Sequence, residues 1–524
     1  MIINEDIRTL LSGRVSDSVT ASVIAEFAQF CRIPHGSGNE RQITEYLHGR
    51  LTQYNLQPEI DVWGNLICDI PASEGCESSP LTVLQGHVDM VCAVKDGSYS
   101  PESDPVIWRL EDDVKSGRMV MCTDGRSSLG ADCGLGNAVL MWAVFTSGCK
   151  HGPLRLIFTV EEELGLAGAK KMDASVFDDV SYVINVDGFH WGRLIAGSAG
   201  GSRETYTMDA RIHPFSEDEM AAQDCLAFEL CLSEFHGGHS GYDIDKGRAN
   251  TIKLLNAFLT EMTSSDVEYR LSSYNGGIGH NVIPGEVETV LVLKKSDRLK
   301  FQKILVRFMK KLVDEYAAND PDGLLRYHET ALPEYVMEAE FSQRLTGFID
   351  EVSDGVFCRM KEIDGVIDTS SNLGMVRFHA ENPEDTAVHV MSFVRSMTPS
   401  CHDKVIAAHR SAAQKYGFQE EIDEYRTWQF DSSNPLLRMT AESYCKITGN
   451  EPEITAVHVG LEPSAFCEKS DHLSMINIGA DIIDPHTVYE RVNVDTIRPF
   501  ALVIADVLEK ISNSEKEPKM TAGK

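Results

Sequence analysis

The chain has 524 residues, and about two to four folding units are expected, because a single hydrophobic core stops growing at a few hundred residues. An apolar content of 42% and a charged content of 24% are typical of a globular protein. The formal net charge of -32 argues against nucleic acid as a partner, since that partner requires lysine and arginine to neutralise phosphates.

Cysteine use and the N-terminus both indicate the cytoplasm. Thirteen cysteines are scattered without any CxxC pair, which favours reduced thiols over a disulfide framework or a cysteine zinc site. The first ten residues, MIINEDIRTL, lack the basic and then apolar layout of a secretory signal. No apolar run reaches the ~20 residues that span a bilayer, so no membrane partner is expected.

The first part of the chain alternates between helical and extended patterns, as in an α/β domain. Apolar residues at helical spacing predict a helix over 40–51, and residues 95–125 are expected to form a long acidic surface loop. Further helix is expected over 138–145. Near-continuous apolar runs predict buried strands at 62–70, 81–91, 154–160 and 182–186.

The pattern changes to α+β between residues 206 and 427 and then changes back. The expected elements of this middle segment are strands at 225–232, 289–293 and 388–395 and helices at 249–262, 298–316 and 403–416. After Trp428, buried strands and helices return. Residues 1–205 and 428–524 are therefore predicted to form one discontinuous catalytic domain, into which 206–427 is inserted.

Polar side chains follow three of the apolar strands of the first domain. His87 and Asp89 end the first strand, Glu162 and Glu163 the second, and Asp187 the third. Open α/β sheets bind their ligands at this carboxyl edge. Positions two apart on a strand face the same way, so Asp89 is expected to orient the His87 ring.

Two imidazoles and three carboxylates are candidate metal ligands, namely His87, Asp132, Glu163, Asp187 and His486. Without a thiolate, this set suits zinc, or manganese and cobalt, in a catalytic site. Five ligands exceed one open site but fit two divalent ions if a carboxylate bridges them, and Asp132 is the best candidate for the bridge. Two such ions can hold a hydroxide between them and polarise a carbonyl.

A carboxylate must also move the proton of the attacking water. Glu162, beside the ligand Glu163, is the candidate general base and then acid. Neighbouring strand residues face opposite ways, so both glutamates can reach the site only if the backbone turns there. Gly165 makes such a turn feasible.

Seven segments occur in the order seen in the dinuclear-zinc aminoacylase, carboxypeptidase and dipeptidase family, which the chain resembles over almost its whole length. They are His87-x-Asp89, Gly130-Ala131-Asp132, Glu162-Glu163-x-Gly165, Asp187-Gly188, Gly238-His239-Ser240-Gly241, Asn281-Val282-Ile283-Pro284 and Pro485-His486. Within the family, the dipeptidase branch is the most similar. The resemblance implies a phosphorylase/hydrolase-like dizinc peptidase domain with an inserted lid that also carries the contact of a homodimer.

The resemblance also implies roles for individual residues. One metal would be held by His87, Asp187 and the shared Asp132, and the other by Asp132, Glu163 and His486. The lid would supply His239, which stabilises the oxyanion in its own or the partner subunit's site. Asn281 and Arg395 would hold the carboxylate of the substrate. Each lid residue also has a structural interpretation, since His239 can cap a glycine-rich turn and Arg395 can pair with an acid.

The implied activity is hydrolysis of dipeptides with a free C-terminal carboxylate, including Xaa-His and β-alanyl-histidine. An N-acyl amino acid amidohydrolase would use the same metals, and a catalytically inactive binding protein is the alternative of another class. The sequence departs from the dipeptidase pattern at Asp484 and Thr487, which flank Pro485-His486 where glycine and serine are more usual. A further departure is Pro463, which follows Glu462 in place of cysteine.

Overall fold

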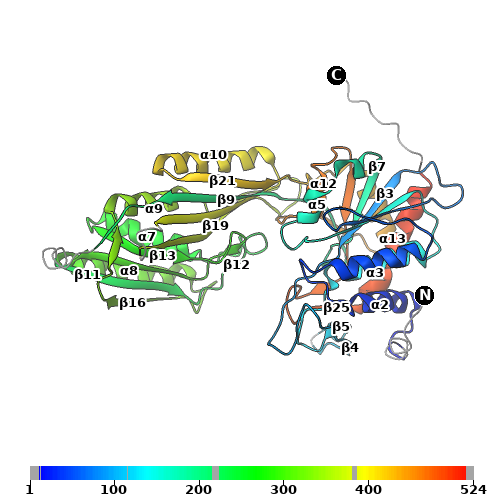
Figure 1. The fold of residues 1–524 in the computed structure, drawn as a ribbon, viewed down its shortest axis with the longest axis horizontal. Helices are drawn as coiled ribbons and strands as arrows, with labels where there is room; N and C mark the ends of the chain where they lie inside the picture. The colour runs from blue at the N-terminus through cyan, green and yellow to red at the C-terminus, as the bar shows by residue number, and fades with distance from the viewer. Residues whose placement is uncertain (1–10, 12, 115, 215–223, 381–385, 515–524) are drawn as a thin grey trace, which may run out of the picture. The chain divides into compact units, whose positions relative to one another are not determined.

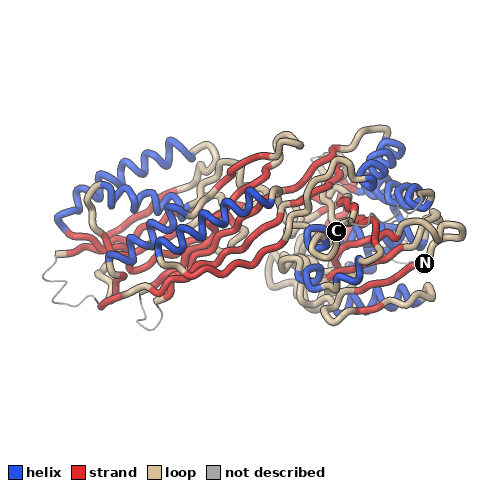
Figure 2. Tube along the Cα trace, turned by 90° about the horizontal axis from the view of Figure 1, so that it is seen from above, coloured by secondary structure: helices blue, strands red, loops and turns tan. Residues whose placement is uncertain are grey.

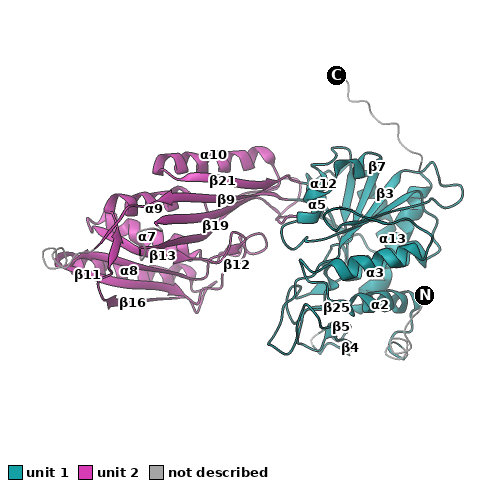
Figure 3. Ribbon diagram, in the orientation of Figure 1, with its two compact units in different colours: residues 1–198, 428–456, 461–524 teal, residues 199–427, 457–460 magenta. Residues whose placement is uncertain are grey.

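The computed structural model describes residues 11, 13–114, 116–214, 224–380 and 386–514. The chain divides into two compact units (Figure 3). Unit 1 comprises Met1–Ser198, Trp428–Ala456 and Leu461–Lys524, and unit 2 comprises Ala199–Thr427 and Val457–Gly460. Unit 2 begins at Ala199 rather than at 206, because strand β9 starts at Gly200 and pairs with β20 and β21 of the same unit.

Unit 1 is built on an eight-stranded sheet in the order β1-β2-β6-β3-β7-β23-β8-β22. Figure 1 labels β3 and β7 of this sheet. The four central strands β6, β3, β7 and β23 run parallel. The strand bounds are β1 (Glu59–Ile60), β2 (Leu66–Ile70), β3 (Leu81–His87), β6 (Leu154–Thr159), β7 (Val180–Asn185), β8 (Arg193–Ser198), β22 (Glu453–Val457) and β23 (Ser474–Asn477). Because the central strands share one direction, their carboxyl ends meet at one edge.

Helices cover both faces of this sheet. Leu84, Leu156 and Ile184 belong to a core that they share with the larger helices. The rings of Phe177, on the short element η1, and Phe466, on α12, pack with 4.9 Å between their centres. The bounds are α2 (Ser18–Phe30), α3 (Arg41–Thr52), α4 (Ala131–Phe145), α5 (Ala167–Lys171), η1 (Ala174–Phe177), α11 (Pro435–Thr448), α12 (Glu462–Phe466), η3 (Val494–Thr496) and α13 (Ile497–Ser512). The sheet is therefore buried on both sides, as its near-continuous apolar strands require.

The expectation of a loop over 95–125 is wrong. Strands β4 (Trp108–Asp112) and β5 (Met119–Thr123) form a four-stranded sheet with β25 (Arg491–Asn493) and β24 (Ile482–Ile483). β5 pairs with the nearby β4 and also with β25, which is about 370 residues away in sequence, so no local pattern indicates this second pairing. The strand expected at 62–70 is shorter, because the Asp61 carboxylate accepts the N–H groups of Trp63 and Asn65 in a turn.

Unit 2 contains an antiparallel sheet in the order β16-β11-β15-β13-β19-β20-β9-β21, with β18 also paired to β19. The strands are β9 (Gly200–Asp209), β11 (Cys225–Ser233), β13 (Tyr269–Gly276), β15 (Val287–Lys294), β16 (Leu324–Thr330), β18 (Gly355–Arg359), β19 (Ile367–His379), β20 (Ala387–Ser396) and β21 (Gln419–Tyr425). Short pairs are formed by β10 (Ile212–Pro214) with β17 (Tyr335–Met337) and by β12 (Gly238–His239) with β14 (Val282–Ile283).

The helices of unit 2 pack on one face of its sheet (Figure 2). Alternate strand residues such as Phe228, Leu291 and Val390 point into the core beneath them. The helices are α7 (Thr251–Ser264), α8 (Arg298–Tyr316), α9 (Ala339–Glu351) and α10 (Pro399–Tyr416), with a short turn η2 (Lys295–Asp297). No helix among the described residues combines the length and apolarity that a membrane crossing requires.

Candidate metal centre

The ring of His87 lies at the carboxyl end of β3, fully buried in unit 1. Its Nδ1 donates to the backbone carbonyl of Asp89 over 2.9 Å and lies 3.5 Å from the Asp89 carboxylate. This contact fixes the ring orientation and leaves Nε2 directed at other groups, as in histidines that bind metals. Nε2 lies 3.0 Å from Asp132 and 3.6 Å from Asp187.

Asp132 stands between the two histidines. Its Oδ1 is 3.0 Å from Nε2 of His87, and its Oδ2 is 2.8 Å from Nε2 of His486. Burial favours the protonated acid, but the contacts with His486 and His87 outweigh it and hold the pKa of Asp132 below its usual range. One carboxylate thus faces two separate nitrogen ligands, which is the geometry of a bridge.

A carboxylate that the sequence analysis missed holds the backbone around Asp132. Glu490 is buried and accepts four N–H groups, those of Leu129, Gly130, Ala131 and Asp132, at 2.7 to 3.3 Å. These groups open α4, where unpaired N–H groups favour an anion. Burial and the nearby Asp132 carboxylate raise the pKa of Glu490 to about 7.

The backbone turns just after β6. Glu161 adopts a left-handed conformation with φ of 52°, and the carbonyl of Glu162 accepts the N–H of Gly165 at 3.0 Å. The Asp89 carboxylate accepts the N–H groups of Glu162 and Glu163 at 3.0 and 3.2 Å. The turn that the glutamate pair requires is therefore present, and Asp89 fixes it.

The two glutamates differ in their surroundings. Oε1 of Glu163 lies 2.9 Å from Nε2 of His486, whereas no hydrogen bond or ion pair is formed by the Glu162 side chain within the described ranges. Burial raises the pKa of Glu162 well above its ordinary value, and the adjacent Glu163 and Asp187 carboxylates reinforce the shift. Glu162 is thus the carboxylate of this cluster that is available to take a proton.

The donor set requires positive charge. Oδ1 of Asp187 and Oε1 of Glu163 are buried and accept no hydrogen bond, although each lies near a histidine nitrogen. Burial raises the pKa of Asp187 well above its ordinary value, and the Asp132 charge adds to this effect. Buried carboxylates with unsatisfied oxygens are expensive unless a cation compensates them, so divalent ions fit this cluster.

The five predicted ligands form two groups. Asp132, Glu163 and His486 have donor atoms within 4.8 Å of one another, and so do His87, Asp187 and the thiol of Cys133. The sequence analysis did not include Cys133. Burial raises the pKa of this thiol well above its ordinary value.

The loop that carries His486 is bent by left-handed residues. Asp484 has φ of 51° and His486 has φ of 62°. Aspartate is one of the residues that tolerate this conformation. The carboxylate of Asp484 accepts the guanidinium of Arg491 at 2.5 Å.

Glu462 is a second acid that the sequence analysis did not assign to the site. It is fully buried at the start of α12 and accepts Nε2 of Gln85 at 2.5 Å. Burial raises its pKa to about 7. Its charge contributes to the raised pKa of Glu162, so this buried acid tunes the candidate base.

The three predicted lid residues lie in unit 2 and gather around Ser240. Arg395 is buried, with its Nε and Nη2 3.4 Å from the Ser240 hydroxyl. The N–H of Ser240 donates to the carbonyl of Asn281 at 2.8 Å. Nδ1 of His239 accepts the N–H groups of Gly241 and Tyr242, which leaves Nε2 directed away from this turn.

Arg395 forms no ion pair with a carboxylate of the described residues. Its guanidinium lies 4.2 Å from the ring centre of Phe393 and 3.5 Å from the Tyr425 hydroxyl. Burial lowers the pKa of Arg395 from its ordinary value, yet an arginine stays charged. A buried guanidinium without an acid partner is suited to an anionic ligand.

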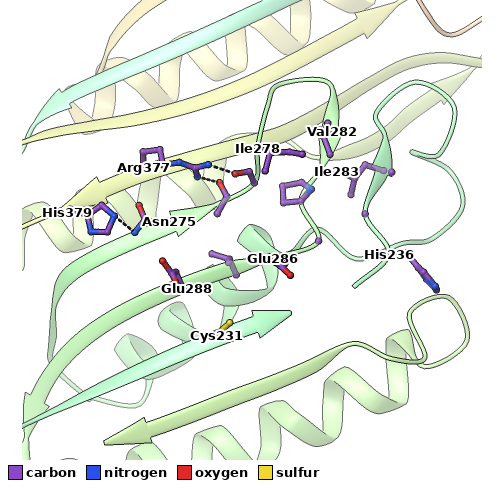
Figure 4. Close-up of a pocket in the computed structure, with 17 residues that line it drawn as sticks. Cys231, His236, Asn275, Ile278, Val282, Ile283, Glu286, Glu288, Arg377 and His379 are labelled. Atoms are coloured by element: carbon purple, nitrogen blue, oxygen red, sulfur yellow. Dashed lines mark hydrogen bonds between the residues drawn. The ribbon is translucent and has the colours of Figure 1, made fainter. Parts of the chain in front are cut away.

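A cavity of about 690 Å³ opens on the sheet of unit 2, beside the segment that carries Asn281 (Figure 4). Arg377 spans its rim and donates to the carbonyls of Gly276 and Gly277, and Asn275 contacts His379 at 2.7 Å. The guanidinium is thus used to hold the glycine turn. Arg377 therefore does not offer an open cation to this cavity.

The comparisons with known proteins cover the chain almost completely. The model of Peptidase family M20/M25/M40 matches residues 83–510. The cytosol non-specific dipeptidase of Escherichia coli (strain K12) is 28% identical over 488 residues, which are 93% of this chain and 96% of that protein.

Solved structures of other proteins are also similar to this chain. The aminoacylhistidine dipeptidase from Vibrio alginolyticus superposes with a TM-score of 0.79 and 27% identity, covering 97% of this chain and 98% of that one. The aminopeptidase PepT from Bacillus cereus ATCC 10987 has a TM-score of 0.51 and 14% identity, with 94% and 98% covered. This second likeness concerns the fold alone.

Proposed function

The chain belongs to Peptidase family M20/M25/M40, and we propose that it is a cytoplasmic dipeptidase that uses two divalent metal ions, most suitably zinc. The family and the α/β fold with an inserted α+β unit, both expected from the motifs, are confirmed. Both dipeptidases named above align with nearly the whole chain, which supports dipeptides with a free C-terminal carboxylate as substrates.

The single observation that carries the proposal is the position of Asp132. Its two oxygens face different histidines, each of which is grouped with a further acid. One ion would be held by His87, Asp187 and Asp132, and the other by Asp132, Glu163 and His486. A set of nitrogen and oxygen donors suits zinc, with manganese and cobalt as chemically close alternatives. When bound, the ions would supply Lewis acidity for the attacking water and the scissile carbonyl.

Glu162 supplies the proton transfers. Its raised pKa lets the carboxylate accept the proton of the attacking water and then release it to the leaving amine. Asp89 keeps Glu162 in place through the backbone N–H and keeps His87 in its orientation. Burial of His87, Asp132 and Asp187 keeps bulk water away from this side of the cluster.

Unit 2 supplies recognition of the substrate. Arg395, free of acid partners in the described chain, would bind the C-terminal carboxylate together with Asn281. His239, held by its Nδ1, would stabilise the oxyanion through Nε2, in its own or the partner subunit. The closest fit to these groups is a short peptide with a free carboxylate, including Xaa-His and β-alanyl-histidine.

A homodimer is also part of the proposal. Helix α8 exposes Leu299, Val306 and Val313, which are 71%, 68% and 65% accessible and lie on one helical stripe. An exposed apolar stripe on a helix of a charged protein marks an interaction surface. The cytoplasmic location rests on the cysteines, all of which lie in the described ranges and form no disulfide.

A substrate panel tests this function on the metal-loaded protein. We expect hydrolysis of dipeptides, loss of activity after chelation, and recovery with zinc, manganese or cobalt. N-acetylation of the dipeptide should reduce the rate if the free α-amino group is recognised. Faster cleavage of N-acyl amino acids than of any dipeptide would instead identify an amidohydrolase, and no hydrolysis of either class would refute the proposal.

A further inference from the structure

A second cluster of metal-binding side chains lies in unit 2, formed by three elements that meet. Cys358 is on β18, Asp368 on β19 and Cys401 in the first turn of α10. Their thiol and carboxylate donor atoms all lie within 4.8 Å of one another. All three belong to unit 2, so their arrangement is independent of the centre in unit 1.

The carboxylate of Asp368 is held rigidly but is not neutralised. Its Oδ1 accepts the hydroxyls of Thr369 at 2.6 Å and Ser396 at 3.3 Å, and its Oδ2 accepts that of Thr398 at 2.6 Å. Within the described ranges, no lysine, arginine or histidine forms an ion pair with it, although Asp368 is only 9% exposed. A buried charge without a counter-ion requires compensation from a cation.

The two thiols complete a donor set for a thiophilic ion. Cys401 lies in the first turn of an 18-residue helix, which fixes its thiol beside Cys358 and Asp368. Burial raises the pKa of the Cys358 thiol, so this group stays protonated until a metal displaces its proton. Both cysteines are half-buried, which leaves the cluster accessible to an ion from solvent.

We propose that Cys358, Asp368 and Cys401 form a third metal site, selective for Zn²⁺ and chemically similar thiophilic divalent ions, with water as a fourth ligand. Two sulfur donors and one carboxylate are a set that zinc accepts in tetrahedral geometry. On binding, each thiol forms a sulfur–metal bond and releases its proton to solvent. The hydroxyls of Thr369, Ser396 and Thr398 orient the carboxylate, as groups around zinc ligands commonly do.

The site would have a structural effect in unit 2. Among the described residues, β18 pairs only with β19, and this pairing has two register irregularities, one on each side of Cys358. A metal ion bound to Cys358 and Cys401 would tie this edge strand to the beginning of α10. We therefore expect metal binding here to stabilise β18 against local opening, without a role in hydrolysis.

Cobalt titration of the full-length, metal-stripped and reduced protein tests the site. A sulfur-to-cobalt charge-transfer band is expected, because two thiolates bind the ion. Metal analysis after loading with zinc should give one equivalent of zinc more than the two ions proposed for unit 1. Cys358→Ser and Cys401→Ser should each remove the band and that equivalent while dipeptide hydrolysis is retained. Asp368→Asn should keep both thiols but weaken cobalt binding at least tenfold.

Cys133→Ser is the matched control, because Cys133 is the thiol that lies beside the ligands in unit 1. This variant should retain the band. Loss of the band in Cys133→Ser with retention in Cys358→Ser would assign the sulfur ligand to unit 1 and overturn the proposal. So would a total of only two metal equivalents, or a Cys358–Cys401 disulfide as the sole product under conditions where zinc is present.

Discussion

The carboxylate of Asp89 accepts a hydrogen bond from the backbone N–H of Glu162 over 3.0 Å. The same carboxylate lies 3.5 Å from Nδ1 of His87, so one side chain positions both a candidate ligand and the candidate base. Groups of this kind are typically worth 10- to 100-fold in metal affinity or activity, about 1.4 to 2.8 kcal/mol.

Asp89→Asn should therefore lower kcat about 10- to 100-fold, because the amide replaces one acceptor oxygen by a donor that faces N–H groups. Steady-state kinetics at saturating metal measures the effect, and Ser37→Ala, which removes only the hydroxyl that donates to Asp89 at 2.8 Å, is the milder control. A change confined to KM would assign Asp89 to substrate binding instead.

Glu162→Gln should retain both metal ions and lower kcat by several orders of magnitude. The substitution preserves the volume of the side chain but removes the group that accepts and releases the proton. Metal analysis of the purified variant, in parallel with kinetics, separates the two roles. A loss of metal in proportion to the loss of rate would show that Glu162 is a ligand, and Glu161→Gln at the neighbouring position should leave both quantities unchanged.

Glu490→Gln should weaken metal binding at the centre in unit 1 about 10- to 100-fold. The carboxylate accepts four N–H groups around Asp132, and the amide cannot accept all of them, so the bridging acid loses its fixed position. Competition with a chromogenic chelator gives the affinity. If the folded variant binds metal as tightly as the unchanged protein while only its thermal stability drops, the role of Glu490 is confined to capping α4.

The buried imidazole of His458 should lower the free energy of unfolding of the protein in acid. Burial, together with the charge of Arg395, lowers the pKa of His458 to about 3 from 6.5. Above pH 6.5 the imidazole is neutral in the folded and the unfolded chain and adds no pH dependence. Between pH 6.5 and about 3 only the unfolded chain binds the proton, so the free energy of unfolding falls by up to about 1.4 kcal/mol per pH unit.

Denaturant titrations between pH 7.5 and 4.5 measure this slope, and His458→Asn should flatten it. Carboxylates elsewhere also titrate as the pH falls, so the informative quantity is the difference between the variant and the unchanged protein. An identical slope in both would mean that His458 takes up its proton in the folded state.

Val306→Lys combined with Val313→Lys should convert a dimer into monomers, since each places a charge on the exposed apolar stripe of α8. Sedimentation velocity measures the change in mass. Lys311→Gln on the same helix is the control and should leave the assembly unchanged. A protein that is monomeric before any substitution would refute the dimer, and an unaltered dimer in the double variant would place the contact elsewhere.

The residues proposed for the centre in unit 1 could be named from the sequence because their signals are local. His87 ends β3 and Asp89 follows two residues later, and the glutamate pair requires a turn that the left-handed Glu161 provides. Glu490 carries no such signal, because its four partners lie about 360 residues earlier and are backbone groups. The sheet that holds β4 and β5 was missed for the same reason, since β5 also pairs with β25, about 370 residues later in the chain.

The division of unit 1 among three stretches of the chain affects its synthesis. His486 and Glu490 follow the whole of unit 2 in the sequence, whereas His87, Asp132, Glu163 and Asp187 precede it. The ribosome therefore synthesises four of the five predicted ligands long before the fifth, His486. A hydrolytic centre built from these residues would be completed only after unit 2 has been synthesised, so shortened products that end before His486 should be inactive.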